Sequence, residues 1–204
     1  DVDNEADGNR PWSWRMSRAQ SGTGSNGDVL SHVISVAHFL TNSSISRVVG
    51  DYTIVHKERA DSQAAGQTKI VDNDDMVAAL IHFENGVKGH IGASRVTWGR
   101  KCGLRWELHG TEGTIMYDQE RLNELKLFTR QDNPATDGFR TVLTGPLHEP
   151  YAAFLPNGGH SLGYMDVKTC ELHDLLSAIE ANSPVWPRFS DGLKIEQVMD
   201  AVDR

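Results

Sequence analysis

The sequence predicts an α+β domain, an open and mostly antiparallel β-sheet with helices packed on one face. One helical pattern comes first, a series of short strand-like segments follows, and two further helical patterns close the chain. The strand-like segments follow one another without helices between them, which favours antiparallel pairing. A doubly wound fold alternates strands with helices, so the order of elements excludes that class.

The composition describes one globular chain of 204 residues with an apolar fraction of 38%. Its net charge of -8 would repel a phosphate backbone, so nucleic acid is excluded as a partner. The longest apolar run, residues 76–81, is too short to cross a bilayer, and no export signal precedes it. Two cysteines, Cys102 and Cys170, provide neither a disulfide framework nor a cysteine-rich zinc site. We therefore expect a soluble, cytoplasmic protein with no membrane partner.

Residues 1–27 form an irregular opening segment rich in Gly, Ser, Asn and Asp, without hydrophobic periodicity. The acidic opening lacks Met and lies outside any expected element, so we expect a fragment that continues from a missing domain. The periodicity changes at residue 28, and we expect one domain over residues 28–204. Its first element is an amphipathic helix over residues 28–41, whose apolar positions recur every three or four residues. They are Leu30, Val33, Ile34, Ala37 and Leu40.

The strands are expected after this helix. Residues 45–55 are rich in β-forming residues, and residues 76–95 alternate on either side of Asn85-Gly86, which predicts a hairpin with a type I′ turn. Both faces of this hairpin carry apolar residues, so we expect a homodimer or higher homo-oligomer through the face that helices do not cover. Shorter strands are expected at residues 104–109, 114–117, 124–128 and 139–143.

The last part of the chain begins with a Pro- and Gly-rich stretch over residues 131–165, longer than an ordinary connecting loop. Two amphipathic helices follow, over residues 166–181 and 191–202. No G-x-G-x-x-G follows a strand and no P-loop occurs, so this chain has no sequence signature of a nucleotide cradle.

Asp28 and His32 are the first candidate catalytic pair. They stand four residues apart on the expected helix, with their side chains on one stripe. A carboxylate one turn from an imidazole can orient it and raise its basicity, as a general base acting on an alcohol requires. The alternative stays open, because Asp at a helix start is commonly a cap and His beside an apolar face is commonly a core residue.

Aromatic and cationic residues suggest a second group of candidates. Trp14 and Arg15 combine an aromatic face with a cationic fork, which suits a polyhydroxylated ligand, although both can simply pack in a core. His160 and Tyr164 lie in or just after a Gly-rich loop. A metal reading would use Asp28, His32, His38 and His160, but no tight ligand spacing supports it, and we expect no metal.

The order of several short motifs resembles the C-terminal domain of the Gfo/Idh/MocA oxidoreductases. The resemblance extends to about residue 202. The motifs that carry it are Trp14-Arg15, Gly27-Asp28-x-x-x-His32, Ala37-His38-Phe39-Leu40, residues 71–75, Phe83-Glu84-Asn85-Gly86, residues 89–94, His109-Gly110-Thr111-Glu112-Gly113 and Met116-Tyr117-Asp118.

The resemblance implies an NAD(P)-dependent dehydrogenase of a sugar, cyclitol or related polyol, with NAD or NADP bound mainly by an N-terminal Rossmann domain absent from this chain. Asp28 and His32 match the family's catalytic positions, and Trp14, Arg15, His160 and Tyr164 fall where relatives line the substrate pocket. The family's Glu-Lys-Pro lysine is missing here, and Ser35 stands where the family often has a second aspartate. Two alternatives remain: a non-catalytic dimerisation or ligand-binding module, and a metal-dependent hydrolase.

Overall fold

The computed structural model describes residues 5–130 and 134–204. The chain divides into two compact units, one formed by Asp1–Arg100 with Pro187–Arg204 and the other by Lys101–Trp186. Every strand pairing is antiparallel, which confirms the predicted fold class. Within the described ranges, no helix combines the length and the apolarity needed to span a membrane.

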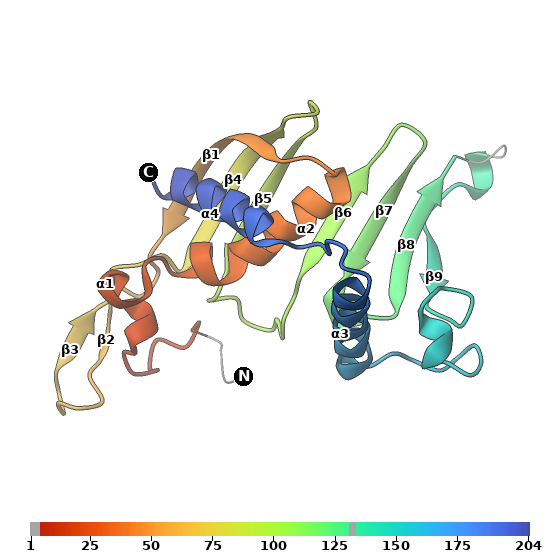
Figure 1. Ribbon diagram of the computed structural model, residues 1–204. Helices are drawn as coiled ribbons and strands as arrows, with labels where there is room; N and C mark the ends of the chain where they lie inside the picture. Colours follow the sequence, from red (N-terminus) through yellow and green to blue (C-terminus); the bar gives the residue numbers. More distant parts are fainter. Residues whose placement is uncertain (1–4, 131–133) are drawn as a thin grey trace. The chain divides into compact units, whose positions relative to one another are not determined.

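The first unit begins with short helical turns and one long helix (Figure 1). The turns are η1 (Trp14–Met16) and α1 (Arg18–Ser21), and the long helix starts with a π-helical turn, η2 (Asn26–Leu30), that runs directly into α2 (Ser31–Thr41). The helix ends at Asn42, whose φ of 46° is the left-handed conformation that closes many helices. The expected helix over residues 28–41 is thus confirmed.

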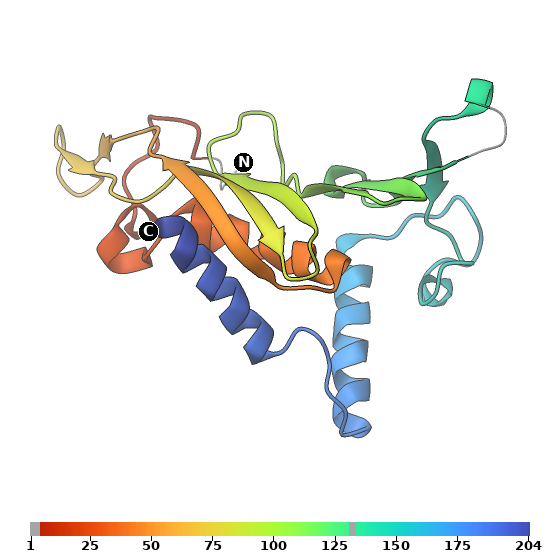
Figure 2. The same ribbon diagram turned by 90° about the horizontal axis from the view of Figure 1, so that it is seen from above.

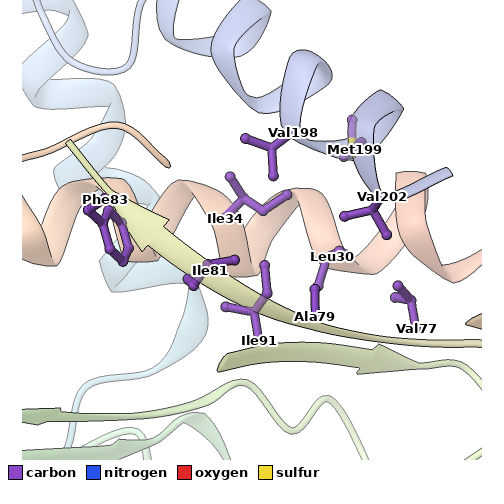
Figure 3. Packing of buried hydrophobic residues seen from close by; sticks show 10 residues of the cluster. All are labelled: Leu30, Ile34, Val77, Ala79, Ile81, Phe83, Ile91, Val198, Met199 and Val202. Carbon is purple, nitrogen blue, oxygen red and sulfur yellow. The ribbon is translucent and has the colours of Figure 1, made fainter. Parts of the chain in front are cut away.

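The sheet of this unit has the strand order β1 (Ile45–Thr53), β4 (Met76–Phe83) and β5 (Lys88–Ser94). Alternate residues of β4 are buried, as the period of two in its sequence predicts. Helix α2 and the last helix, α4 (Phe189–Asp203), lie on the same side of this sheet (Figure 2). Side chains from both helices and two of the strands interdigitate there (Figure 3); they are Leu30, Ile34, Val77, Ala79, Ile81, Phe83, Ile91, Val198, Met199 and Val202.

The turn between β4 and β5 differs from the predicted type I′ turn. Gly86 has a positive φ of 88°, but Asn85 does not, and type I′ needs both. The Gly86 N–H donates to the Phe83 carbonyl at 3.1 Å, so the turn spans residues 83–86. Its geometry follows from anchoring to the end of α2 and the loop after it, because the Asn85 side chain donates to the Thr41 carbonyl and the Glu84 N–H to the Ser44 carbonyl.

A second, two-stranded sheet was not predicted from the sequence. It pairs β2 (Glu58–Ala60) with β3 (Thr68–Ile70). Each strand has three residues, too short for an alternating pattern to stand out.

The second unit contains a four-stranded meander and one long helix. The strands pair in chain order, so the four predicted strands are confirmed. The predicted helix over residues 166–181 is confirmed as α3 (Tyr164–Glu180), and single helical turns occur between the strands and before α3. The remaining bounds are β6 (Arg105–His109), β7 (Gly113–Asp118), η3 (Gln119–Arg121), β8 (Glu124–Thr129), η4 (Pro134–Thr136), β9 (Arg140–Leu143) and η5 (Tyr151–Ala153).

Candidate functional site

The irregular opening segment is fixed by the β2–β3 hairpin. The guanidinium of Arg59, which is buried on β2, donates to the backbone carbonyls of Glu5 and Asp7. The indole N–H of Trp12 donates to the Ile70 carbonyl on β3 at 2.9 Å. A buried cation with several carbonyl acceptors needs a fixed backbone around it. The hairpin therefore fixes the position of the backbone that leads to Trp14 and Arg15.

A short acidic segment between β3 and β4, residues 72–75, holds the same region from the other side; we call it the acidic strap. The Asn73 side-chain amide donates to the Arg15 carbonyl at 2.7 Å. Its oxygen accepts from the Arg95 guanidinium at 2.9 Å, and the Asp75 carboxylate accepts from the same guanidinium at 2.9 Å. All these strap side chains are buried, so their mutual hydrogen bonds are what makes their burial tolerable.

The start of the long helix also rests on the acidic strap. The Asp74 carboxylate accepts from the Gly24 N–H at 2.7 Å and from the Asn26 N–H at 2.6 Å. The first amides of a helix have no partner within the helix and attract an anion. Here that anion is a side chain of the protein itself.

Asp28 and His32 both lie on this helix, Asp28 in the π-helical turn and His32 in the first turn of α2. The Asp28 carboxylate lies 3.5 Å from the Arg15 guanidinium. His32 is exposed, and within the described ranges no hydrogen bond joins it to Asp28. A π-helical turn contains more residues than an α-helical one, so the face-to-face stacking expected for two α-helical residues four apart does not apply.

Trp14, Arg15 and Asp28 form one cluster. The Trp14 side chain is 55% exposed, and the Arg15 guanidinium lies over its ring, 5.7 Å from the centroid. The structure thus brings together three of the predicted site residues. They line a cleft of about 500 Å³ together with Ser21, Gly22, Thr23, Gly24, Gly27, Arg95, Glu196, Met199, Asp200 and Asp203.

Helix α4 gives this cleft an acidic wall, formed by Glu196, Asp200 and Asp203. Asp203 is hydrogen-bonded to the Arg18 guanidinium, which raises the pKa of that group further above its usual range. The cleft is therefore lined by hydrogen-bond acceptors on one side and by the Arg15 donors and the Trp14 ring on the other. This combination suits a ligand that offers hydroxyl donors and apolar C–H faces.

His160 and Tyr164 belong to the second unit. His160 is exposed, and its Nδ1 lies 3.1 Å from the Asn157 carbonyl. Tyr164 is the first residue of α3, with Lys168 positioned 5.7 Å from the centre of its ring. Whether either residue contributes to the cleft stays a prediction.

Carboxylates at the starts of the described long helices disfavour binding of the phosphates of a dinucleotide. Besides the start of the long helix, one N–H is bound at the start of each of α3 and α4, since Asp166 accepts from the N–H of the N-cap residue Gly163 at 2.7 Å and Asp191 from that of the N-cap residue Arg188 at 2.9 Å. A pyrophosphate needs such amides free. In the part of the chain that the structure describes, all three long helices therefore start at a carboxylate of the chain itself.

The histidines do not gather at one place. Among the described residues, no group of three His, Cys, Asp or Glu side chains is arranged to hold a metal ion. His38 is half-buried at the end of α2, where burial lowers its pKa and the nearby Lys194 lowers it further. Its Nε2 accepts a hydrogen bond from the Ile45 N–H at 3.1 Å, so the imidazole is neutral.

The sequence analysis did not identify the cleft residues that lie far from Asp28 in the sequence. Arg95 and the acidic wall of α4 lie far from Asp28 in the sequence, and their approach depends on tertiary packing. The run of four polar residues 72–75 before a strand was a visible signal, since charged residues are seldom fully buried without a partner. It indicates a buried polar network, although not which residues are its partners.

The sequence matches a known family and one of its characterised members. Residues 1–116 match the family model described as the GFO/IDH/MocA C-terminal domain. A levoglucosan dehydrogenase of Pseudarthrobacter phenanthrenivorans is 36% identical over 208 residues, which cover 97% of this chain and 53% of that protein. The chain thus spans about half the length of this relative.

Solved structures agree with the sequence comparison. An NAD-binding oxidoreductase from Klebsiella pneumoniae has a TM-score of 0.89 at 38% identity, covering 97% of this chain and 52% of its own. Levoglucosan dehydrogenase in complex with NADH and levoglucosan has a TM-score of 0.89 at 37% identity, covering 98% of this chain and 53% of its own. The similarity extends over both units in each case.

Proposed function

The chain belongs to the Gfo/Idh/MocA family of oxidoreductases, and from this premise we propose that it is the substrate-binding half of an NAD-dependent sugar dehydrogenase. The relatives it matches include a levoglucosan dehydrogenase crystallised with NADH and with a sugar. The chain covers about half of that protein, so the proposed activity belongs to a longer protein in which this chain is one part.

The observation that carries the proposal is the cluster of Trp14, Arg15 and Asp28 in a cleft beside the helix of His32. An exposed indole ring stacks on the C–H face of a sugar, and the guanidinium and the carboxylate bind its hydroxyls as donor and acceptor. These residue types, on separate elements held by the acidic strap, form a rigid polyol site.

Oxidation of a secondary alcohol removes one proton from the hydroxyl and a hydride from the carbon. We assign the proton to His32, because histidine is the side chain that most often acts as a general base. Asp28 is paired with Arg15 rather than with His32, so its role here is to hold the Arg15 fork and to accept a substrate hydroxyl. His160 and Tyr164, which belong to the second unit, remain proposed substrate-binding residues.

The cofactor is proposed to be NAD, in keeping with the relative crystallised with NADH, and its nicotinamide would take the hydride. Because the helix starts of this chain are capped by carboxylates, we propose that the NAD phosphates bind to the part of the protein outside this chain. The residues of this chain therefore orient the sugar and receive the proton.

The test is the variant His32→Ala in the protein that contains both halves. Loss of a positioned base lowers kcat by about 10² to 10⁴. The melting temperature and the affinity for NADH should stay close to those of the unmodified protein. The matched control is His173→Ala, on an exposed position of α3, with unchanged kcat. A His32→Ala protein that keeps its turnover while losing thermal stability would give His32 a structural role only and remove the proposed mechanism.

We further propose that a second copy of the chain covers the outer face of the β1–β4–β5 sheet. Val49 and Leu80, which are cross-strand partners on that face, are 74% and 63% exposed. Apolar side chains that gather on one sheet face mark an interface. A non-catalytic dimerisation module is the competing function, and it predicts association of this kind without turnover. Cytoplasmic location stays part of this proposal.

A further inference from the structure

The helix that carries Asp28 and His32 begins without a cap of its own. Ser25 precedes its first turn, in the position where a serine oxygen usually accepts from a helix amide. Its side chain makes no such bond. Within the described ranges, its buried hydroxyl has no hydrogen-bond partner at all. The first amides of this helix therefore depend on another element.

That element is the acidic strap, 50 residues further along the chain. Asp74 takes three successive amides: its carboxylate accepts from Gly24 and Asn26, and its carbonyl accepts from the Ser25 N–H at 2.9 Å. The Asp74 side chain is almost completely buried, with a relative exposure of 3% for the residue. A buried carboxylate bound to amides at a helix start gains both hydrogen bonds and the helix dipole.

The approach of the two backbones is as close as it can be. A Cβ atom on Gly24 would lie 1.9 Å from the Asp74 carbonyl oxygen, a distance at which no side chain fits. Only glycine at this position allows the strap to reach the helix start.

The strap and the helix start are both bound to residues that line the cleft. The Asn73 side chain, next to Asp74, donates to the Arg15 carbonyl, and the Asn26 side-chain amide donates to the Met199 carbonyl of α4 at 3.0 Å. The strap therefore holds both members of the Arg15–Asp28 pair: Asn73 binds the Arg15 backbone, and Asp74 binds the start of the helix that carries Asp28. A shift of the strap would change the distance between the pair and the angle at which the helix presents His32.

We propose that Asp74 is a positioning residue that sets the place of Asp28 and His32 by capping their helix from a distance. This inference rests on the proposed function, in which His32 receives the proton. Asp74 itself lies below the helix start and touches no substrate. It acts through the amides of Gly24, Ser25 and Asn26.

The experiment uses Asp74→Asn in the protein with both halves. The N–H groups of Gly24 and Asn26 bind different oxygens of the Asp74 carboxylate, and asparagine replaces one of these oxygens by an NH2 group, which donates and cannot accept. We expect kcat to fall by about 10-fold or more, with the KM for NADH unchanged, because a small misplacement of a reacting group lowers the rate of the chemical step. The matched control is Asp72→Asn, which removes the same charge from the same strap, at a carboxylate that accepts from the Arg18 N–H of another helix.

A second readout separates positioning from mere stability. In protein labelled with ¹³C-histidine, the imidazole signal of His32 should change in Asp74→Asn and stay unchanged in Asp72→Asn. Gly24→Ala, which pushes the same contact apart from the helix side, should reproduce the change if Asp74→Asn does not fold. An unchanged His32 signal together with unchanged turnover in either folded variant would overturn the inference.

The two proposals fail in different ways. Full turnover in His32→Ala removes the proposed base, whereas the His32 signal still reports whether Asp74 positions the helix. Reduced turnover in Asp74→Asn with an unmoved His32 signal would contradict the positioning role and leave His32 as the base.

Discussion

Arg15 and Asp28 form an ion pair of 3.5 Å in which the two side chains are 48% and 57% exposed. An ion pair this open to water contributes between 0 and about 1 kcal/mol to folding stability. A pair that contributes so little to folding is consistent with the proposed role of both groups in binding a sugar.

This relationship predicts the behaviour of Arg15→Gln. The variant should lower kcat/KM for the sugar by about 10-fold or more, because a hydrogen bond from a charged donor to a ligand is worth roughly 1.5–3 kcal/mol. The melting temperature should change by no more than about 4 °C, since the pair adds at most about 1 kcal/mol to folding. Steady-state kinetics and thermal unfolding of one preparation measure both.

The matched control is Arg121→Gln, which breaks the exposed Arg121–Glu124 pair on the second unit. It should leave both measurements unchanged. A large drop in melting temperature for Arg15→Gln, without a kinetic effect, would show that the Arg15–Asp28 pair is structural.

The second prediction concerns pH and His38. Burial and Lys194 lower its pKa below the usual 6.5, while Asp191 and Glu84 oppose the shift. The unfolded chain takes up a proton below pH 6.5 more readily than the folded protein, so stability is complete above that pH and falls as the pH drops below it. Protonation also removes the acceptor that binds the Ile45 N–H.

His38→Gln keeps an acceptor oxygen and removes the titration. We expect the free energy of unfolding, measured by urea at pH 7.5 and pH 5, to fall less between the two values in His38→Gln than in the unmodified protein. His173→Gln, at an exposed position of α3, should retain the full pH dependence. Equal slopes in all three proteins would exclude His38 as the source.

The third prediction concerns the outer face of the first sheet. Leu80→Lys places a charge at the centre of the face proposed to meet a second copy, and burying an unpaired ammonium is strongly unfavourable. The variant should be monomeric by light scattering at concentrations at which the unmodified protein is a dimer or larger. Leu147→Lys, at a 95% exposed position of the second unit, should leave the mass unchanged. A monomeric unmodified protein at tens of micromolar would remove the proposed interface.

The sequence predicted the elements whose signals are local. The apolar spacing of α2 and the alternation of β4 arise from helix and strand periods that any buried face must follow. The turn at Asn85-Gly86 was predicted to be type I′ because the dipeptide favours it. Its real shape depends on hydrogen bonds to Thr41 and Ser44, which no local pattern reveals.

The candidate site shows the same division. Asp28 and His32 were found from their spacing and from the family resemblance, and Trp14 and Arg15 from their composition. Asp74 was visible only as one of several acidic residues in a motif. Its partners lie about 50 residues earlier, and a carboxylate in the sequence does not show which amides it will meet.

The last prediction is that the 204-residue chain, folded by itself, does not bind NADH with micromolar affinity. Binding of the pyrophosphate requires free amides at a helix start, and the described starts of the long helices already hold Asp74, Asp166 and Asp191. Two phosphate charges would have to approach these carboxylates in a chain whose net charge is -8.

Titration calorimetry measures this directly, with circular dichroism to establish that the chain is folded. The protein that contains both halves is the positive control and should bind NADH under the same conditions. Micromolar binding by the chain alone would mean that it holds the cofactor phosphates at a site independent of the helix starts. The division of labour proposed between the two halves would then be wrong, because the half that orients the sugar would also hold the cofactor.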